Sequence, residues 1–296
     1  MRLIINTSHL PERVGGMKKT VDLFADAGFD GIDFSAAASE EFYTEGAHPD
    51  SYYKDLRAYA ESKGVPFVQA HAPHGSSFTD EAQTKKRFDE IVCSMKNAAL
   101  LGVKNIVVHP CQHLPYLEPG VPEKLFEINM DFYRRLLPYA EEYGIRVCTE
   151  NMFQGDMHIL NVHSTCSHPA EMIRYFDEMN HPLFGCCLDI GHTSVVREDA
   201  ASFIRALGKE RLTCLHVHDV DESHDRHLPP YFGGAIAWDR VMAALAEIGY
   251  EGNFTYETDY IYATRPVAFA PAIAHLSAAI GRHLIGKFEA FQTPVI

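Results

Sequence analysis

One pattern recurs along the 296-residue chain: a polar, helix-length stretch, a glycine, and then four to six apolar residues. Glycine supplies the left-handed residue that often ends a helix, as in Ala27-Gly28-Phe29 and Tyr143-Gly144-Ile145. The apolar runs are continuous rather than alternating, which is typical of parallel strands that are buried on both faces. There are eight such runs: Leu3–Asn6, Gly31–Phe34, Pro66–Ala70, Asn105–Val108, Arg146–Thr149, Gly185–Leu188, Leu212–Val217 and Asn253–Tyr256.

The stretches between these runs carry apolar residues three or four positions apart, as amphipathic helices do. Eight strand-then-helix units, roughly 25–40 residues apart, predict an α/β protein with a (β/α)8 architecture, the TIM barrel. A doubly wound sheet is disfavoured, because no G-x-G-x-x-G motif follows an early strand. We expect residues 1–296 to form a single domain, with a short C-terminal extension after about Arg282.

Charge and composition narrow the range of partners. The net charge of −14 is the opposite of what a protein that neutralises phosphates needs, so a nucleic-acid partner is disfavoured. No apolar run approaches the roughly 18–20 residues that a membrane helix needs. We therefore do not expect a membrane among the partners. The cysteines number seven and lie mostly in apolar runs, which predicts buried free thiols and a cytoplasmic location.

Polar side chains stand where the predicted strands end. In such barrels the carboxyl ends of the strands carry the catalytic groups. Carboxylates and imidazoles, which are ligands of divalent metals, end six successive strands here. They are His71, His109, Glu150, Asp189, His216 and Glu257, with His218 and Asp219 following His216 in the same run, and with His192, Asp225 and His227 in the adjoining loops.

Four of these residues form the expected inner shell of a metal site, namely Glu150, Asp189, His216 and Glu257. Three carboxylates and one imidazole suit one divalent ion, with Mn²⁺ preferred and Zn²⁺, Co²⁺ or Mg²⁺ as alternatives. A bound cation would also offset the repulsion among carboxylates that are buried close together.

In their order and spacing these motifs resemble the xylose isomerase-like barrel superfamily, which groups sugar isomerases and epimerases with endonuclease IV. The resemblance extends from Ile4 to about Ala279. Its most specific parts are Thr149-Glu150-Asn151, Cys187-Leu188-Asp189-Ile190-Gly191-His192, Leu215-His216-Val217-His218-Asp219, Asp225-Arg226-His227, Gly233-Gly234-Ala235-Ile236-Ala237-Trp238 and Tyr256-Glu257.

The resemblance implies one of two metal contents. In epimerases of the tagatose type, the residues that match the four inner-shell positions hold one divalent ion, and the two glutamates also act on the substrate. In endonuclease IV a trinuclear zinc site adds residues that match His71, His109, His192, Asp225 and His227. All nine positions carry a suitable residue here, so the ligand types leave both alternatives open.

The predicted loops favour a small neutral substrate. Lys and Arg are absent from residues 75–80, 110–122 and 151–169, and Arg226 is the only basic residue near its loop. Because phosphate contacts supply much of the affinity for DNA, this disfavours DNA and phosphorylated sugars. A sugar or polyol is expected to bind instead, among loop residues that include Phe153, Met157, Tyr231, Phe232, Tyr260 and Tyr262.

The expected reaction is isomerisation or epimerisation through an enediolate, with the metal polarising the substrate carbonyl. Glu150 or Glu257 removes a proton beside the carbonyl, and the other glutamate returns one. His192 is expected to hydrogen-bond to a substrate oxygen, while Asp225, Arg226 and His227 are candidates for metal or substrate contacts. Two alternatives stay open: a metal-dependent lyase or dehydratase on keto-inositol or 3-oxo-glycoside substrates, and an AP endonuclease.

One position departs from the resemblance. Epimerases of the tagatose type carry an arginine six residues after the metal-binding histidine, and this chain has Glu222 there. We therefore expect substrate handling to differ from theirs. Homo-oligomers are common in the superfamily, and the sequence is compatible with one.

Overall fold

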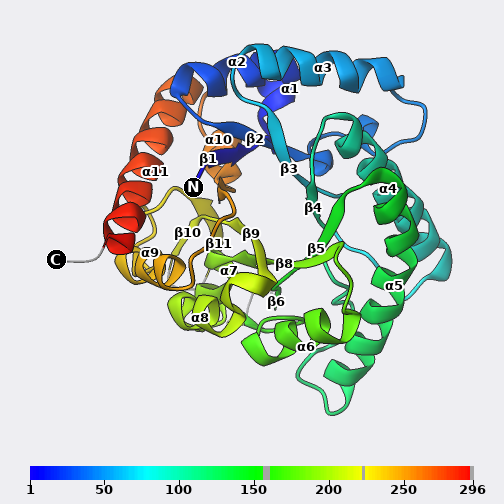
Figure 1. Ribbon diagram of the computed structural model, residues 1–296. Coiled ribbons are helices and arrows are strands. Elements are labelled where there is room, and N and C mark those ends of the chain that lie inside the picture. The colour runs from blue at the N-terminus through cyan, green and yellow to red at the C-terminus, as the bar shows by residue number, and fades with distance from the viewer. Residues whose placement is uncertain (156–160, 222–223, 294–296) are drawn as a thin grey trace.

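The eight predicted runs form one parallel, eight-stranded sheet in the computed structural model, which describes residues 1–155, 161–221 and 224–293. The strand order is β12-β1-β2-β3-β4-β5-β8-β9. Val217, directly after β9, joins the two edges, since its N–H donates to Thr255 O at 2.8 Å and its carbonyl accepts from Glu257 N at 3.1 Å. The predicted barrel is therefore confirmed (Figure 1). The strands are β1 (Leu3–Asn6), β2 (Gly31–Ser35), β3 (Phe67–His71), β4 (Asn105–Val107), β5 (Arg146–Glu150), β8 (Phe184–Asp189), β9 (Leu212–His216) and β12 (Phe254–Tyr256).

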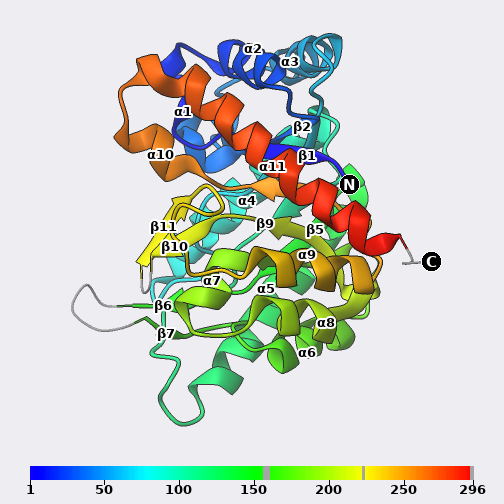
Figure 2. The same ribbon diagram turned by 90° about the vertical axis from the view of Figure 1, so that its left-hand side faces the viewer.

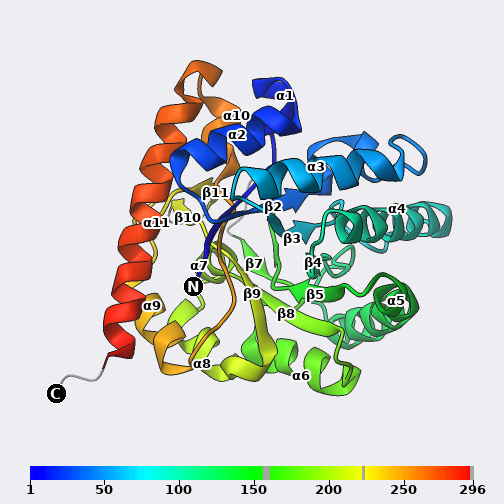
Figure 3. The same ribbon diagram turned by 45° about the horizontal axis from the view of Figure 1, so that its top comes forward.

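Long helices surround the barrel and cover the outer face of the sheet (Figures 1 and 3). Glycines end two of them in the left-handed conformation, as predicted, with φ of 87° at Gly28 and 62° at Gly144. Buried apolar residues on their inner faces form the main core between helices and strands. The helices are α2 (Met17–Ala27), α3 (Asp50–Ser62), α4 (Glu81–Leu100), α5 (Val121–Tyr143), α6 (Pro169–Met179), α8 (Ala200–Arg211), α9 (Trp238–Glu247) and α11 (Ala270–Gln292). None of the described helices is long and apolar enough to span a membrane.

The residues after Arg282 belong to the barrel. Helix α11 continues unbroken through Arg282 to Gln292, where the sequence predicts the start of an extension. Leu284, Ile285 and Phe288 are buried there, because the same apolar face of the helix continues to pack on the barrel. Arg282 itself makes an ion pair with Asp30 at 2.6 Å.

Short elements gather at one end of the barrel, beyond the carboxyl ends of the strands (Figure 2). Two antiparallel hairpins, β6–β7 and β10–β11, lie there and are formed by Phe153–Gln154 with Val162–His163 and by Asp219–Asp221 with His224–Leu228. The remaining short helices are α1 (Leu10–Val14), α7 (Ile190–Val195), α10 (Asp259–Thr264), η1 (Ala36–Ala38), η2 (Glu40–Phe42) and η3 (Val267–Phe269).

Strand alternation places the polar groups inside the barrel. Cys148, Cys187 and Cys214 form a small buried cluster with Val107, separate from the core under the helices. Side chains two positions apart on a strand share a face. Glu150, Asp189 and His216 each follow one of these cysteines by two positions, so they form the next layer toward the strand ends.

Candidate metal centre and active site

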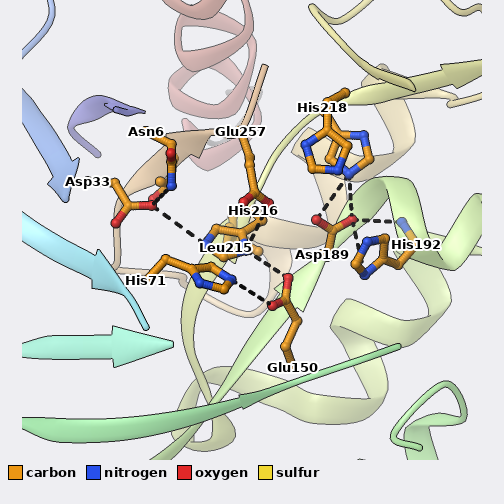
Figure 4. Close-up of polar contacts among 12 residues, drawn as sticks. Asn6, Asp33, His71, Glu150, Asp189, His192, Leu215, His216, His218 and Glu257 are labelled. Atoms are coloured by element: carbon orange, nitrogen blue, oxygen red, sulfur yellow. Dashed lines mark hydrogen bonds and ion pairs between the residues drawn. The ribbon is translucent and has the colours of Figure 1, made fainter. Parts of the chain in front are cut away.

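The structure brings together the four residues expected to form the inner shell. Glu150, Asp189, His216 and Glu257 each offer one ligand atom, and these atoms lie within 4.8 Å of one another. His216 is the hub, with Nδ1 at 2.7 Å from Glu150 Oε1 and 3.2 Å from Glu257 Oε2 (Figure 4). In the sheet register Asp189 lies directly beside His216. The carboxyl ends of four strands thus converge on one point.

The donor set fits a divalent metal ion. All four side chains are buried, and three of them are carboxylates, which repel one another in a dry site. Oxygen Oε2 of Glu150 is buried and has no hydrogen bond of good geometry among the described residues, although His109 Nε2 lies 3.0 Å from it. A cation would satisfy this oxygen and neutralise the carboxylates.

The charges in this cluster shift one another's protonation. Burial would raise the pKa of Glu150, but His216, His109 and His71 hold it well below its ordinary value. Burial would likewise depress the pKa of His216, yet Glu257 and Glu150 keep it well above its ordinary value. For Glu257, burial dominates and the pKa is raised. The pKa values of the two glutamates are therefore shifted in opposite directions.

His71 and His109 lie on the Glu150 side of the cluster. His109 Nε2 is 3.0 Å from Glu150 Oε2, and His71 Nε2 is 3.6 Å from the same oxygen. His71 Nδ1 lies 2.6 Å from the carbonyl oxygen of Ala72, to which it donates, so Nε2 is left to face the carboxylate. Both histidines are placed where they could ligate an ion beside Glu150.

A second group of ligand-type side chains lies on the other side of Asp189. It consists of His192, His218, Asp225 and His227, whose ligand atoms lie within 4.8 Å of one another. His218 Nε2 is 3.0 Å from Asp189 Oδ1, which links this group to the centre. Asp225 Oδ2 lies 3.0 Å from His227 Nε2 and 3.6 Å from His192 Nε2.

Asn151 fixes the geometry between the two groups. Its side-chain amide donates to Asp189 O at 3.0 Å and its amide oxygen accepts from Asp189 N at 2.7 Å. Its carbonyl oxygen lies 2.8 Å from His192 Nδ1 and accepts from that nitrogen, so Nε2 of His192 points toward Asp225. Burial would lower the pKa of His192, but Asp189 and Asp225 raise it to about 10.

The site includes His218 and Asp33, although the sequence analysis gave them no role. His218 is fully buried against Asp189. The sequence feature that could have indicated it is its spacing of two residues from His216, because residues two apart on an extended chain share a face. Asp33 on β2 lies 3.6 Å from His216 Nε2 and accepts from Asn6 Nδ2 at 2.9 Å. The sequence feature that could have indicated Asp33 is a carboxylate in the middle of an apolar run.

A cavity of about 1030 Å³ opens over the two groups. His109, His192, Asp225, His227 and Glu257 line it, together with segments that include the β6–β7 hairpin. Among the described residues that line it, none is Lys or Arg.

Several expected substrate contacts lie elsewhere. Arg226 pairs with Asp221 at 2.9 Å and does not line the cavity, because alternation on β11 turns it away from Asp225 and His227. Phe153 lines the cavity as expected, whereas Tyr262 is buried in the core. Exposed at the surface outside the cavity are Tyr231, Phe232 and Tyr260. Met157 and Glu222 lie outside the described residues.

Comparison with known proteins extends over most of the chain. The family described as xylose isomerase-like TIM barrel matches residues 21–279. A D-psicose 3-epimerase of Ruminiclostridium cellulolyticum is 24% identical over 81% of this chain and 77% of that protein. A D-tagatose 3-epimerase-like protein has a similar structure, with a TM-score of 0.76 at 21% identity, covering 98% of this chain and 99% of that one. The IOLI protein with a bound zinc atom aligns over the full length of both chains, with a TM-score of 0.75 at 18% identity.

Proposed function

Because the chain belongs to the xylose isomerase-like TIM barrel family, we propose that it is a divalent-metal-dependent isomerase or epimerase of a neutral sugar or polyol. The observation that carries the proposal is Glu257, a buried carboxylate that both joins the four-residue cluster and lines the cavity. The similarity to 3-epimerases supports a carbohydrate substrate. The cavity wall supports a neutral one, since its described lining has no cation for a phosphate.

Glu150, Asp189, His216 and Glu257 would hold the ion, with Mn²⁺ as the preferred metal. A divalent ion held there supplies Lewis-acid polarisation of the substrate carbonyl. The similarity to a protein that binds zinc supports a metal in this fold.

The protein's own groups then move the proton. One glutamate removes the proton from the carbon beside the carbonyl, and the bonding electrons of that C–H bond go into the enediolate. The partner glutamate returns a proton to the opposite face in epimerisation, or a proton is delivered to the neighbouring carbon in isomerisation. Glu257 lines the cavity whereas Glu150 lies behind it, so we assign the first contact with substrate to Glu257.

His192 orients the substrate in this proposal. It lines the cavity and its ring is fixed by Asn151 and by an edge contact with Phe153, with ring centroids 5.0 Å apart. Asp189 and Asp225 raise the pKa of His192 to about 10, which favours the protonated ring, and from that ring Nε2 can donate a hydrogen bond to Asp225 or to a substrate oxygen. Asp225 Oδ2 faces Nε2 of His192 at 3.6 Å, and His227 Nε2 contacts the same oxygen at 3.0 Å.

Deuterium exchange tests the proposal. The metal-loaded protein is incubated in D₂O with a panel of ketoses, aldoses and keto-inositols, and deuterium at carbon is followed by NMR. We expect incorporation beside the carbonyl with at least one neutral sugar, accompanied by an epimer or isomer. Loss of water or of a glycoside leaving group instead of an isomer would identify a lyase. Absence of exchange with every member of the panel would overturn the assignment.

A trinuclear-zinc AP endonuclease is a second candidate, favoured by the ligand group around Asp225 and His227. The described cavity lining without Lys or Arg opposes it, because DNA affinity depends on phosphate contacts. Incubation with an abasic-site duplex in the presence of Zn²⁺ separates the two functions. Strand cleavage that is lost in a His227→Ala variant would favour the nuclease.

A further inference from the structure

A third group of metal-ligand side chains lies apart from the cavity. It consists of His163, His168 and Glu198, each offering one ligand atom, and these atoms lie within 4.8 Å of one another. The two imidazole rings stack with centroids 3.9 Å apart, and His168 Nδ1 is 3.0 Å from Glu198 Oε1. None of the three belongs to the groups around Glu150 or Asp225.

Three different segments bring these residues together. His163 ends β7, His168 precedes the first residue of α6, and Glu198 follows α7. The backbone fixes Glu198, whose N–H donates to Thr193 O at 2.8 Å. The ring of His163 is oriented by Ser167, whose Oγ lies 3.0 Å from Nδ1. Such hydrogen bonds to the non-coordinating nitrogen are typical of metal-bound histidines.

The group is accessible to an ion from solution. The side chains of His168 and Glu198 are 44% and 30% exposed. His168 precedes α6 without capping it, since its side chain makes no cap hydrogen bond. The imidazole of His168 therefore has no capping role, and its Nδ1 faces Glu198 instead.

We propose that His163, His168 and Glu198 form an outer binding site for one transition-metal ion, independent of the catalytic centre. Two imidazoles and one carboxylate match the nitrogen and oxygen ligands that Zn²⁺ prefers, with water completing the coordination. The ion would tie β7 to the segment that follows α7. Phe153 on the same hairpin contacts His192 on α7, so the outer ion would brace the cavity wall from outside.

Metal counting on the full-length protein tests this site. Protein stripped with a chelator is dialysed against Zn²⁺, and bound zinc is measured by elemental analysis for wild type, His168→Ala and Glu198→Gln. The control is His275→Ala, which removes an exposed histidine that pairs with Asp26 at 3.1 Å but belongs to none of the metal-ligand groups found among the described residues. A His216→Ala variant keeps the outer site while disrupting the central one.

We expect wild type and His275→Ala to bind one more zinc per chain than His168→Ala and Glu198→Gln. Titration should show that the affinity of the outer site for zinc falls about 100-fold in the two variants. Loss of a residue that only hydrogen-bonds to a ligand already lowers metal affinity by about 10–100-fold, and loss of the ligand itself should lower it at least as much. The His216→Ala protein should retain the outer ion, whatever its activity. Equal zinc contents in wild type and His168→Ala, with both folded by circular dichroism, would overturn the proposal.

Discussion

Glu257 differs from the other three members of the central cluster, because it alone among them lines the cavity. In Glu257→Gln the amide keeps the size of the side chain but cannot accept the substrate proton. We expect kcat to fall by about 10²–10⁴-fold, the usual contribution of a positioned proton acceptor. Steady-state kinetics on the substrate found by deuterium exchange would measure this. Turnover at the wild-type rate would show that Glu257 is not the proton acceptor.

The position of His218 depends on Gly191. A Cβ at residue 191 would collide with the imidazole of His218, which is buried and 3.0 Å from Asp189 Oδ1. Gly191→Ala should therefore displace the imidazole from Asp189 and weaken metal binding beside it by roughly 10-fold, as loss of supporting contacts does. Zinc titration measures the effect.

The matched control for Gly191→Ala is Gly286→Ala, because a Cβ at Gly286 meets no atom within 4 Å. Zinc affinity should be unchanged in that variant. If Gly191→Ala also binds zinc with wild-type affinity, the imidazole of His218 has room to relax and does not depend on this glycine.

Residue types at the strand ends indicated much of the candidate site. They did not indicate residues whose direction depends on how the folded chain places them. Glu150 and Asp189 could be placed because a strand end fixes where a side chain points. Arg226 could not, because the hairpin that carries it forms only in the folded chain and turns it toward Asp221. Asp33 was missed because an isolated carboxylate in an apolar run gives no indication of its partner until β2 aligns beside β1.

Helix α11 offers a comparison within one element. A Cβ at Gly281 would collide with the buried side chain of Leu3 on β1, whereas Gly286 is exposed with open space around it. Gly281→Ala should destabilise the protein by about 1–3 kcal/mol through overpacking. Gly286→Ala should stabilise it by up to about 1 kcal/mol, since alanine favours the helix. Urea unfolding of both variants measures the difference, and equal stabilities would contradict the close packing of α11 on β1.

The regular elements could be predicted because their signals are local. Glycine after a helix and an apolar run after that glycine are short-range features, and the eight strands fall where they indicate. The end of the chain was harder, because Leu284, Ile285 and Phe288 are recognised as core only when α11 lies against the barrel. An apolar helical face indicates burial but not the surface that covers it.

Closure of the barrel is a property of the whole chain, since β12 must meet both β1 and Val217. It also forces carboxylates from distant parts of the sequence into one buried site. Glu150 and Glu257 are separated by 107 positions (257 − 150) yet both lie beside His216 Nδ1. The strand-then-helix repeat predicts that the barrel closes. The repulsion between the carboxylates that closure brings together follows only from the three-dimensional arrangement.

Metal removal should therefore destabilise the folded chain as a whole. An ion that binds only the folded state stabilises it by about 2.7 kcal/mol when present at 100 times its Kd, so chelation should lower Tm by several degrees. To remove any contribution from the outer site, the scan is run on His168→Ala with Mn²⁺ and after chelation. The same comparison on His168→Ala/His216→Ala should show almost no metal dependence, because the hub of the central cluster is gone. Elemental analysis verifies the metal content of each His168→Ala sample. If its Tm is the same with and without bound metal, a cation does not offset the repulsion between Glu150, Asp189 and Glu257.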